Sequence, residues 1–226
     1  MAFQTPSIPY LCSIIKFIRS MITPPYVIKE IVGNQNHSST SVLSELLEQR
    51  IIYFAEDVNE ETAATLCCLL MYLHAKDKKK PITIYIDSPG GSVYSGNSII
   101  DTMDLIKADG GIIKTVCFGL CASYGAVILC NGSRGYRSAL KRSTIMIHQV
   151  LTGVGKRVQA TDISIVAEES NRLKKMLAQV ISDNTGKPYD KVVEDCERDH
   201  WLAAEDCLPG AYGKYGLIDK IETKLK

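Results

Sequence analysis

The sequence predicts an α/β fold built around a mostly parallel sheet. From Arg50 onward, short apolar runs typical of buried strands alternate with segments whose apolar residues recur at helical spacing. The chain has 226 residues, with 46% hydrophobic and 23% charged content, which is enough for one globular domain with a sizeable core. No internal repeat or low-complexity tract interrupts the alternation. Disorder, a collagen-like chain and a small disulfide scaffold are therefore excluded.

The N-terminal part is expected to differ from this body. We predict a divergent segment over residues 1–41 and a folded domain over residues 42–226. Residues 9–23 are apolar, but Lys16 and Arg19 interrupt them, and the stretch is too short to cross about 30 Å of hydrocarbon. It also lacks the basic start and small-residue cleavage site of a signal peptide. No acidic residue precedes Glu30, however, so a leader or propeptide stays open for this segment.

The charge and the cysteine content indicate which classes of partner and which cellular compartment to expect. The chain has 26 Lys and Arg residues against 25 Asp and Glu, a net charge of +1, without the positive excess that drives phosphate binding. Nucleic acid is therefore not expected as a partner. Most of the eight cysteines lie in apolar runs, which favours buried thiols in a reducing compartment over disulfides. No C-x-x-C pair is present, so neither a metal site nor a cofactor is predicted.

Two strand and helix pairs begin the predicted body. Residues 51–54 form an apolar strand, and Asn59 caps the helix that follows. The inner face of this helix is predicted to carry Ala63, Leu66, Cys67, Leu70 and Leu73. Residues 82–86 form the second strand, which ends in the tight turn DSPGGS at 87–92. The helix after this turn is predicted to face the core with Ile99, Met103 and Ile106.

A third and a fourth strand follow along the chain. Residues 112–118 are predicted to run into a glycine-containing turn at 119–125 and then into an apolar helix over 126–129. Residues 144–147 form the fourth strand. This strand delivers His148 at its end.

A long helix follows a loop rich in glycine and basic residues. Thr161 is predicted to cap about 23 residues, which reach about 35 Å at 1.5 Å each and outrun one small domain. Its apolar positions step by three and four, as on a coiled-coil seam: Ile163, Val166, Leu173, Leu177 and Val180. We interpret it as a self-association element, the alternative being one long core helix. Pro188 then starts a short helix, and residues 217–221 form an edge strand.

Two of the strand-to-helix turns carry glycines beside small polar residues. Such turns leave backbone N–H groups free at a helix N-terminus, which suits an anion. The chain has neither G-x-x-x-x-G-K-[ST] nor G-x-G-x-x-G, so a nucleotide site is poorly supported. An oxyanion hole is the other candidate. Ser123 in the second turn is then the candidate nucleophile.

A serine nucleophile needs a base. His148 ends an apolar strand, and strand ends of open α/β sheets are where sites form. His37 and His74 lie in polar surroundings and are expected to be solvated, whereas His200 directly follows an acid and competes with His148.

The imidazole in turn needs a carboxylate that holds its tautomer. Asp195 and Asp199, in the segment EDCERDHW after the long helix, are the candidates. The spacing leaves both open.

Four motifs in the same order resemble the proteolytic subunits of Clp proteases, the ClpP family. They are DSPGGSVYSG at 87–96, FGLCASYGAVIL at 118–129, MIHQ at 146–149, and ERDHWLAAEDC with YGLIDKI near the C-terminus. The similarity covers residues 45–226. It implies a serine endopeptidase of crotonase-like fold, with repeated β-β-α and βαβ units and a protruding handle helix. It also implies a homo-oligomer of two stacked seven-membered rings that encloses the active sites and degrades unfolded polypeptides.

The resemblance also assigns roles to single residues. It makes Ser123 the nucleophile, His148 the general base and Asp199 the orienting acid. Gly91 and Tyr124 match the two positions whose backbone N–H groups form the oxyanion hole of the family.

Further positions are implied for the substrate and for ring stacking. The substrate is expected to add as an extended strand beside Gly90, Ser92, Val93, Gln149, Val150 and Leu151, with cleavage after apolar residues. Residues 163–181 match the handle helix, and Glu197 and Arg198 match inter-ring contacts. The chain departs from the family where Asp87, Tyr124 and Val150 replace the usual Asn, Met and Pro, and the loop after Gln149 is about two residues longer.

Partners and alternatives follow from the same resemblance. No Walker motif is present, so a separate AAA+ unfoldase such as ClpX, ClpA or ClpC is expected to feed unfolded substrates. The ring contains this chain alone or together with a paralogous subunit. We expect no membrane partner, and a location in the bacterial cytoplasm or in the stroma or matrix of an organelle. The alternatives are a catalytically silent structural subunit of a mixed ring and a crotonase-type acyl-CoA enzyme.

Overall fold

The computed structural model describes residues 26–30, 37–155, 157–210 and 214–224. It divides into two compact units, residues 1–49 and 50–226, and the division expected between residues 41 and 42 stays a prediction. The apolar stretch at 9–23 lies outside the described residues. Among the described helices, none combines the length and the apolar character needed to cross a bilayer.

The first unit contains a hairpin and a short helix. Strand β1 (Tyr26–Glu30) pairs antiparallel with β2 (His37–Ser41), and α2 (Val42–Glu48) follows directly. The Ser41 hydroxyl accepts a hydrogen bond from the Leu43 N–H at 3.2 Å and so caps the helix. Sequence patterns miss the hairpin because HSSTS shows no alternation of apolar residues.

The described residues of the second unit form a seven-stranded sheet. Its strands are β3 (Ile51–Phe54), β4 (Ile82–Ser88), β5 (Ile113–Ala122), β6 (Arg137–Leu140), β7 (Thr144–Ile147), β8 (His200–Ala203) and β9 (Lys220–Glu222). The order β3-β4-β5-β6-β9 is parallel throughout, and β7 adds in parallel to the far end of β5. Only β8 runs antiparallel among these, beside β7. The predicted α/β fold with a mostly parallel sheet is confirmed.

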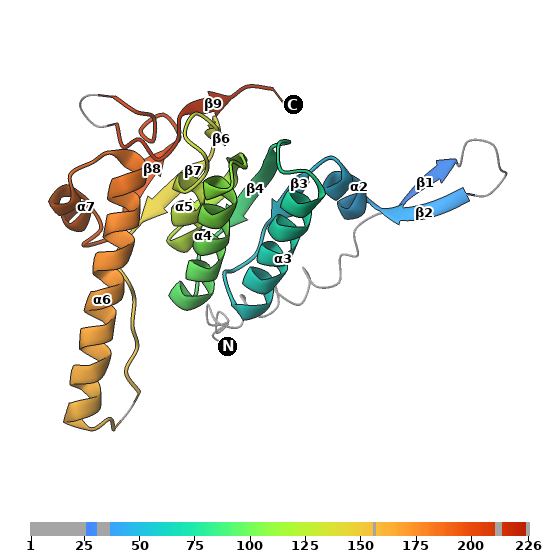
Figure 1. Cartoon of the computed structure of the whole chain (residues 1–226). Coiled ribbons are helices and arrows are strands. Elements are labelled where there is room, and N and C mark those ends of the chain that lie inside the picture. Colours follow the sequence, from blue (N-terminus) through green and yellow to red (C-terminus); the bar gives the residue numbers. More distant parts are fainter. Residues whose placement is uncertain (1–25, 31–36, 156, 211–213, 225–226) are drawn as a thin grey trace, which may run out of the picture. The chain divides into compact units, whose positions relative to one another are not determined.

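Helices α3 (Glu60–Lys76), α4 (Val93–Ala108) and α5 (Tyr124–Cys130) cover one face of this sheet (Figure 1). Helix α6 (Ala160–Thr185) packs against α5 and against α7 (Tyr189–Asp195). Helices α3 and α4 pack side by side across β3, β4 and β5. Along β4 the side chains of Ile82, Ile84 and Ile86 are buried, and those between them are half-buried, as expected for a sheet with one covered face.

The first helix of this unit agrees with its sequence pattern in detail. Asn59 is the N-cap of α3, where its side chain and that of Thr62 form a capping box. All five residues expected on the inner face of α3 are buried. The inner residues expected for α4 are buried as well. Strands β3 and β7 have the predicted bounds.

Three predicted elements differ from the structure: the turn at 119–125, the cap of the long helix, and the edge strand at 217–221, which the structure places at Lys220–Glu222 (β9). The turn expected at 119–125 is wrong, because β5 continues to Ala122, with a register shift where the Asp87 carboxylate accepts the Leu120 N–H at 3.0 Å. Strand β6 was not expected from its short sequence RSAL. Helix α6 has 26 residues and begins at Ala160 with Gln159 as its N-cap, so the predicted cap at Thr161 is wrong.

Helix α6 extends well beyond the rest of the unit (Figure 1). Its buried residues, Leu173, Ala178 and Ile181, all lie in its C-terminal half. In the N-terminal half, Ile163 and Ile165 are 47% and 59% exposed. The apolar residues of α6 are therefore buried within the chain only in its C-terminal half. The helix is not a core helix over its full length.

A buried ion pair joins β6 to the C-terminal segment. The Arg137 guanidinium donates to both carboxylate oxygens of Asp219, at 2.6 and 3.0 Å, and to the carbonyl of Asn184 at 2.7 Å. The Arg137 side chain is 5% exposed. Burial alone would raise the pKa of Asp219, but the hydrogen bonds from Arg137 hold that pKa below its usual range.

Asp219→Asn is expected to destabilise the protein by about 3 kcal/mol, because it leaves a buried guanidinium without its anion. Thermal and denaturant unfolding of the purified protein measure this loss. The matched control is Glu194→Gln, which breaks the exposed pair with Lys191 and is expected to cost less than about 1 kcal/mol. Equal effects of the two substitutions would contradict this account of Arg137.

Candidate active site

Two strand-to-helix turns lie against each other at one edge of the sheet. One joins β4 to α4 and the other joins β5 to α5. Gly90, in the first turn, has φ +89°, and a Cβ there would lie 2.7 Å from both Ser123 Cβ and the Tyr124 nitrogen. A side chain at this position would therefore push the two turns apart, and only glycine permits the close approach.

Ser123 occupies the sharp bend between β5 and α5. Its backbone has φ +52° and ψ −122°, a strained conformation for a residue with a side chain. Its N–H donates to the carbonyl of Met146 at 2.8 Å, which fixes the bend against β7. The hydroxyl makes no capping hydrogen bond to α5. It is therefore free for another partner.

That partner is His148, which directly follows β7. Strands β5 and β7 pair in parallel with Ala122 opposite Met146, so the residues that follow both strands emerge at the same edge. The distance between His148 Nε2 and Ser123 Oγ is 2.8 Å. The imidazole is 11% exposed, which limits its competing contacts with water.

The second imidazole nitrogen faces Asp199. Strand β8 pairs antiparallel with β7, with Ile147 opposite His200, and this register brings the residue before β8 next to the residue after β7. The distance between His148 Nδ1 and Asp199 Oδ1 is 3.4 Å, and the Asp199 side chain is 59% exposed. This separation is longer than an ordinary hydrogen bond, and contacts between catalytic groups in free enzymes are often long and shorten when substrate binds.

The other candidates for base and acid lie elsewhere. Asp195 pairs with Lys191 at 2.9 Å on α7. His200 packs edge-on against the Tyr215 ring, with centroids 5.8 Å apart. His74 bonds Asp109 at 2.8 Å, and the side chain of His37 lies outside the described residues. The structure thus brings Ser123, His148 and Asp199 together and gives Asp195, His200 and His74 other partners.

Gly91 and Tyr124 provide two backbone N–H groups beside the Ser123 hydroxyl. Within the described residues, neither N–H donates to an acceptor. Gly91 is held in place because Val58 donates to the Gly90 carbonyl and accepts from the Ser92 N–H, both at 2.8 Å. A Cβ at Gly91 would lie 2.2 Å from the Val58 oxygen. The pinned backbone suits a preorganised oxyanion hole.

Two neighbouring cavities open beside these groups. The first, of about 260 Å³, is lined by Gly91, Ser123, Tyr124 and His148 and by mainly apolar residues that include Val93, Val127, Met146, Gln149, Val150, Leu151, Leu177 and Ile181. The second, of about 490 Å³, lies between residues 91–94, residues 150–153 and α6, and includes Ser92. Of the residues expected to bind substrate, only Gly90 lines neither cavity. Sequence reasoning missed Val127 and Ile181, whose apolar positions are those of ordinary core residues.

Glu197 and Arg198 lie just before Asp199. Glu197 pairs with Lys174 of α6 at 2.8 Å, and its carbonyl accepts from the Gln149 side chain at 2.9 Å. Arg198 is 86% exposed. The segment that carries Asp199 is therefore tied both to α6 and to the residue after His148. The inter-ring role expected for Glu197 and Arg198 stays a prediction.

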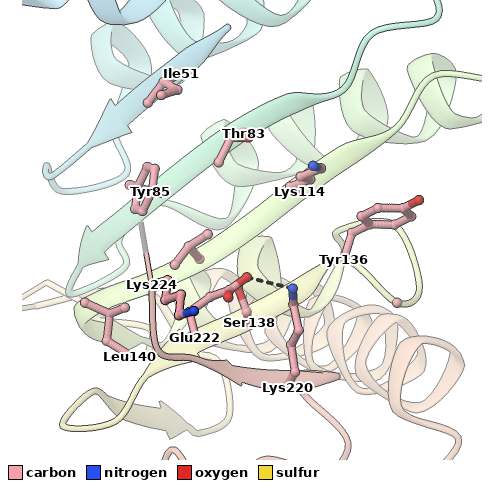
Figure 2. Close-up of a pocket in the computed structure, with 12 residues that line it drawn as sticks. Ile51, Thr83, Tyr85, Lys114, Tyr136, Ser138, Leu140, Lys220, Glu222 and Lys224 are labelled. Atoms are coloured by element: carbon pink, nitrogen blue, oxygen red, sulfur yellow. Dashed lines mark ion pairs between the residues drawn. The ribbon is translucent and has the colours of Figure 1, made fainter. Parts of the chain in front are cut away.

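A third cavity, of about 340 Å³, lies on the sheet face away from the helices (Figure 2). It is lined by side chains of β3, β4, β5, β6 and β9, among them Tyr85 and Lys114, and by Tyr136 just before β6. The ion pair between Lys220 and Glu222, at 2.7 Å, crosses it. It contains none of the residues expected to act in catalysis.

Cysteine and metal chemistry find little support in the described residues. The seven cysteines among them are free thiols, and Cys12 lies outside. Burial raises the pKa of Cys130, Cys196 and Cys207 to about 12, so they stay protonated at neutral pH. Across the ranges that the structure describes, no group of three or more His, Cys, Asp or Glu side chains could hold a metal ion.

Comparison with known proteins agrees with this geometry. The sequence model of the Clp protease family matches residues 34–224. The chain is also 44% identical, over 200 residues, to the ATP-dependent Clp protease proteolytic subunit 2 of Parasynechococcus marenigrum (strain WH8102). This match covers 88% of the chain and 95% of the relative.

Proposed function

The chain belongs to the Clp protease family, and from this premise we propose that Ser123, His148 and Asp199 are its catalytic triad. It is a Clp protease proteolytic subunit and a serine-type endopeptidase, with an α/β fold consistent with that of ClpP. The observation that carries the assignment of the triad is the 2.8 Å contact between His148 Nε2 and Ser123 Oγ. The free N–H groups of Gly91 and Tyr124 beside it support the same reading.

The mechanism uses each group in turn. His148 Nε2 takes the proton of Ser123 as Oγ attacks the peptide carbonyl carbon. The carbonyl oxygen becomes an oxyanion, and the N–H groups of Gly91 and Tyr124 bind it. His148 then gives its proton to the leaving amine, and a water attacks the acyl-enzyme by the same route. Asp199 accepts the Nδ1–H and holds the imidazole with Nε2 free to act as the base.

Substrate is proposed to bind as an extended strand between residues 91–94 and 150–153. Main-chain hydrogen bonds from such a strand recognise many sequences, and side-chain pockets add preference. The cavity beside Ser123 is lined by apolar residues such as Val127, Met146 and Leu177. We therefore expect cleavage after apolar residues.

Family membership implies an oligomeric chamber served by an ATPase. We propose the finer arrangement of two stacked seven-membered rings, with an unfoldase such as ClpX, ClpA or ClpC. The exposed Ile163 and Ile165 on the projecting half of α6 support ring stacking. The ring is proposed to contain this chain alone or together with a paralogous subunit. The free thiols support a reducing compartment, in line with the bacterial cytoplasm or an organelle stroma or matrix.

Labelling with a fluorophosphonate tests the triad. We expect the wild-type protein to be labelled at Ser123, because the probe needs an activated serine, and we expect no labelling of Ser123→Ala. Sedimentation of the same sample is expected to give a mass many times 24.9 kDa. An assembled but unlabelled wild type would favour the silent structural subunit instead. A stable monomer would contradict the ring assembly.

A further inference from the structure

The side chain of Tyr124 makes a contact that the mechanism above does not use. Only 2% of Tyr124 is exposed. Its hydroxyl donates to Asn97 Oδ1 at 2.7 Å. Its ring lies against the backbone of Gly96, where a Cβ would come within 2.3 Å of ring atom Cε1. The first residue of α5 is thus seated on the first turns of α4.

This contact lies between the two donors of the proposed oxyanion hole. The Gly91 N–H is placed by the start of α4, where Ser92 is the N-cap. The Tyr124 N–H is placed by the start of α5. Because the donors belong to different helices, their separation depends on how these helices pack. The Tyr124 ring spans that junction, from the donor on α5 to Gly96 and Asn97 of α4.

The environment of the phenol keeps it in the form that the contact needs. Burial, with a smaller contribution from Asp101, raises the pKa of Tyr124 well above its ordinary value. The hydroxyl therefore stays protonated and acts as a donor at neutral pH. Gly96 is helical and buried, so its lack of a side chain makes room for the ring.

We propose that Tyr124 and Asn97 are positioning residues of the hydrolysis: the hydroxyl-to-amide hydrogen bond, with the ring seated on Gly96, sets the spacing of the two oxyanion donors. This inference rests on the proposed function. The oxyanion forms only after Ser123 attacks the peptide carbonyl. The contact is therefore expected to stabilise the tetrahedral state and to leave the affinity for the substrate unchanged.

The test compares Tyr124→Phe and Asn97→Leu with wild type, using the full-length protein in its native assembly. A fluorogenic peptide reports kcat and KM, and a peptide aldehyde, whose adduct oxygen occupies the oxyanion hole, reports transition-state affinity. Losing one oxyanion donor costs about 10²- to 10³-fold in kcat, and loosening one costs less. We expect kcat and aldehyde affinity to fall by about 5- to 20-fold with KM within about twofold.

Two further variants separate positioning from stability. Gly96→Ala would drive a Cβ into the ring, so its loss in kcat should exceed that of Tyr124→Phe. In a Tyr124→Leu background no ring remains for the Cβ to meet. There, Gly96→Ala should lower kcat by less than half the fold-change that it causes in the wild-type background. Tyr72→Phe on α3 is the matched control, since Tyr72 is 53% exposed, and it should leave kcat, KM and aldehyde affinity unchanged.

Results other than these would overturn the positioning role of Tyr124 and Asn97. Wild-type values of kcat and aldehyde affinity in Tyr124→Phe and Asn97→Leu would overturn the inference while leaving the proposed function intact. Parallel changes in kcat and KM, or equal costs of Gly96→Ala in both backgrounds, would also overturn it. A wild type that neither hydrolyses peptide nor reacts with fluorophosphonate would overturn the proposed function, and this inference with it.

Discussion

Ser123→Ala is expected to lower kcat for peptide hydrolysis by about 10⁶-fold, the largest effect of any single substitution. The substitution removes Oγ, which receives the acyl group, and nothing else in the cavity replaces it. The main-chain bend is expected to survive, because the Ser123 N–H still donates to Met146. KM for the residual reaction should change little, since the substrate pairs mainly with backbone groups.

His148→Ala is expected to cost about as much, and the double variant no more than either single one. The reason is that Oγ and Nε2, 2.8 Å apart, act as one unit. Fluorogenic peptide turnover, with labelling to quantify competent sites, measures all three variants. Ser98→Ala, on the exposed side of α4, is the control and should retain full activity. Strictly additive losses for Ser123 and His148 would contradict a shared proton-transfer step.

The positions of Ser123 and His148 could be predicted because each lies at the end of an apolar run, whereas the spacing left Asp195 and Asp199 both open as the acid. Ser123 follows an apolar run and precedes an apolar helix, and His148 follows the apolar run at 144–147. Their proximity could not be read from the chain. It depends on β7 pairing with the end of β5, although β6 lies between them in the sequence and pairs with the beginning of β5.

The parts that sequence patterns missed have tertiary causes. Strand β6 is short, and its Arg137 is charged, yet it is buried because Asp219 and carbonyl oxygens satisfy the guanidinium. The extension of β5 past Gly119 depends on the Asp87 carboxylate of the neighbouring strand. Local propensity contains neither contact. The apolar seam of α6, in contrast, was readable, but only its C-terminal half finds a partner within the chain.

Asp199→Asn is expected to lower kcat by between about 10³- and 10⁴-fold, with KM little changed. A carboxylate can only accept the Nδ1–H, whereas the asparagine amide can donate to Nδ1 and so favour the tautomer that carries its proton on Nε2. That proton would face Ser123 Oγ, 2.8 Å away, and His148 could no longer take the serine proton. The Asp199 side chain is 59% exposed, so water can partly replace the carboxylate. We therefore expect the loss in kcat not to exceed the upper end of this range.

Asp195→Asn is the matched control, four residues away on the same segment. Its carboxylate serves the ion pair with Lys191 at 2.9 Å and has no described contact with His148. It should leave kcat within about twofold. It should lower the stability of the protein measurably, because the Asp195 side chain is only 11% exposed and its loss leaves Lys191 without this partner. Peptide turnover and thermal unfolding of both variants decide between the two acids. A large loss of kcat in Asp195→Asn, with normal activity in Asp199→Asn, would reassign the acid, because the register of β7 and β8 that sets Asp199 beside the imidazole would then not hold in the working enzyme.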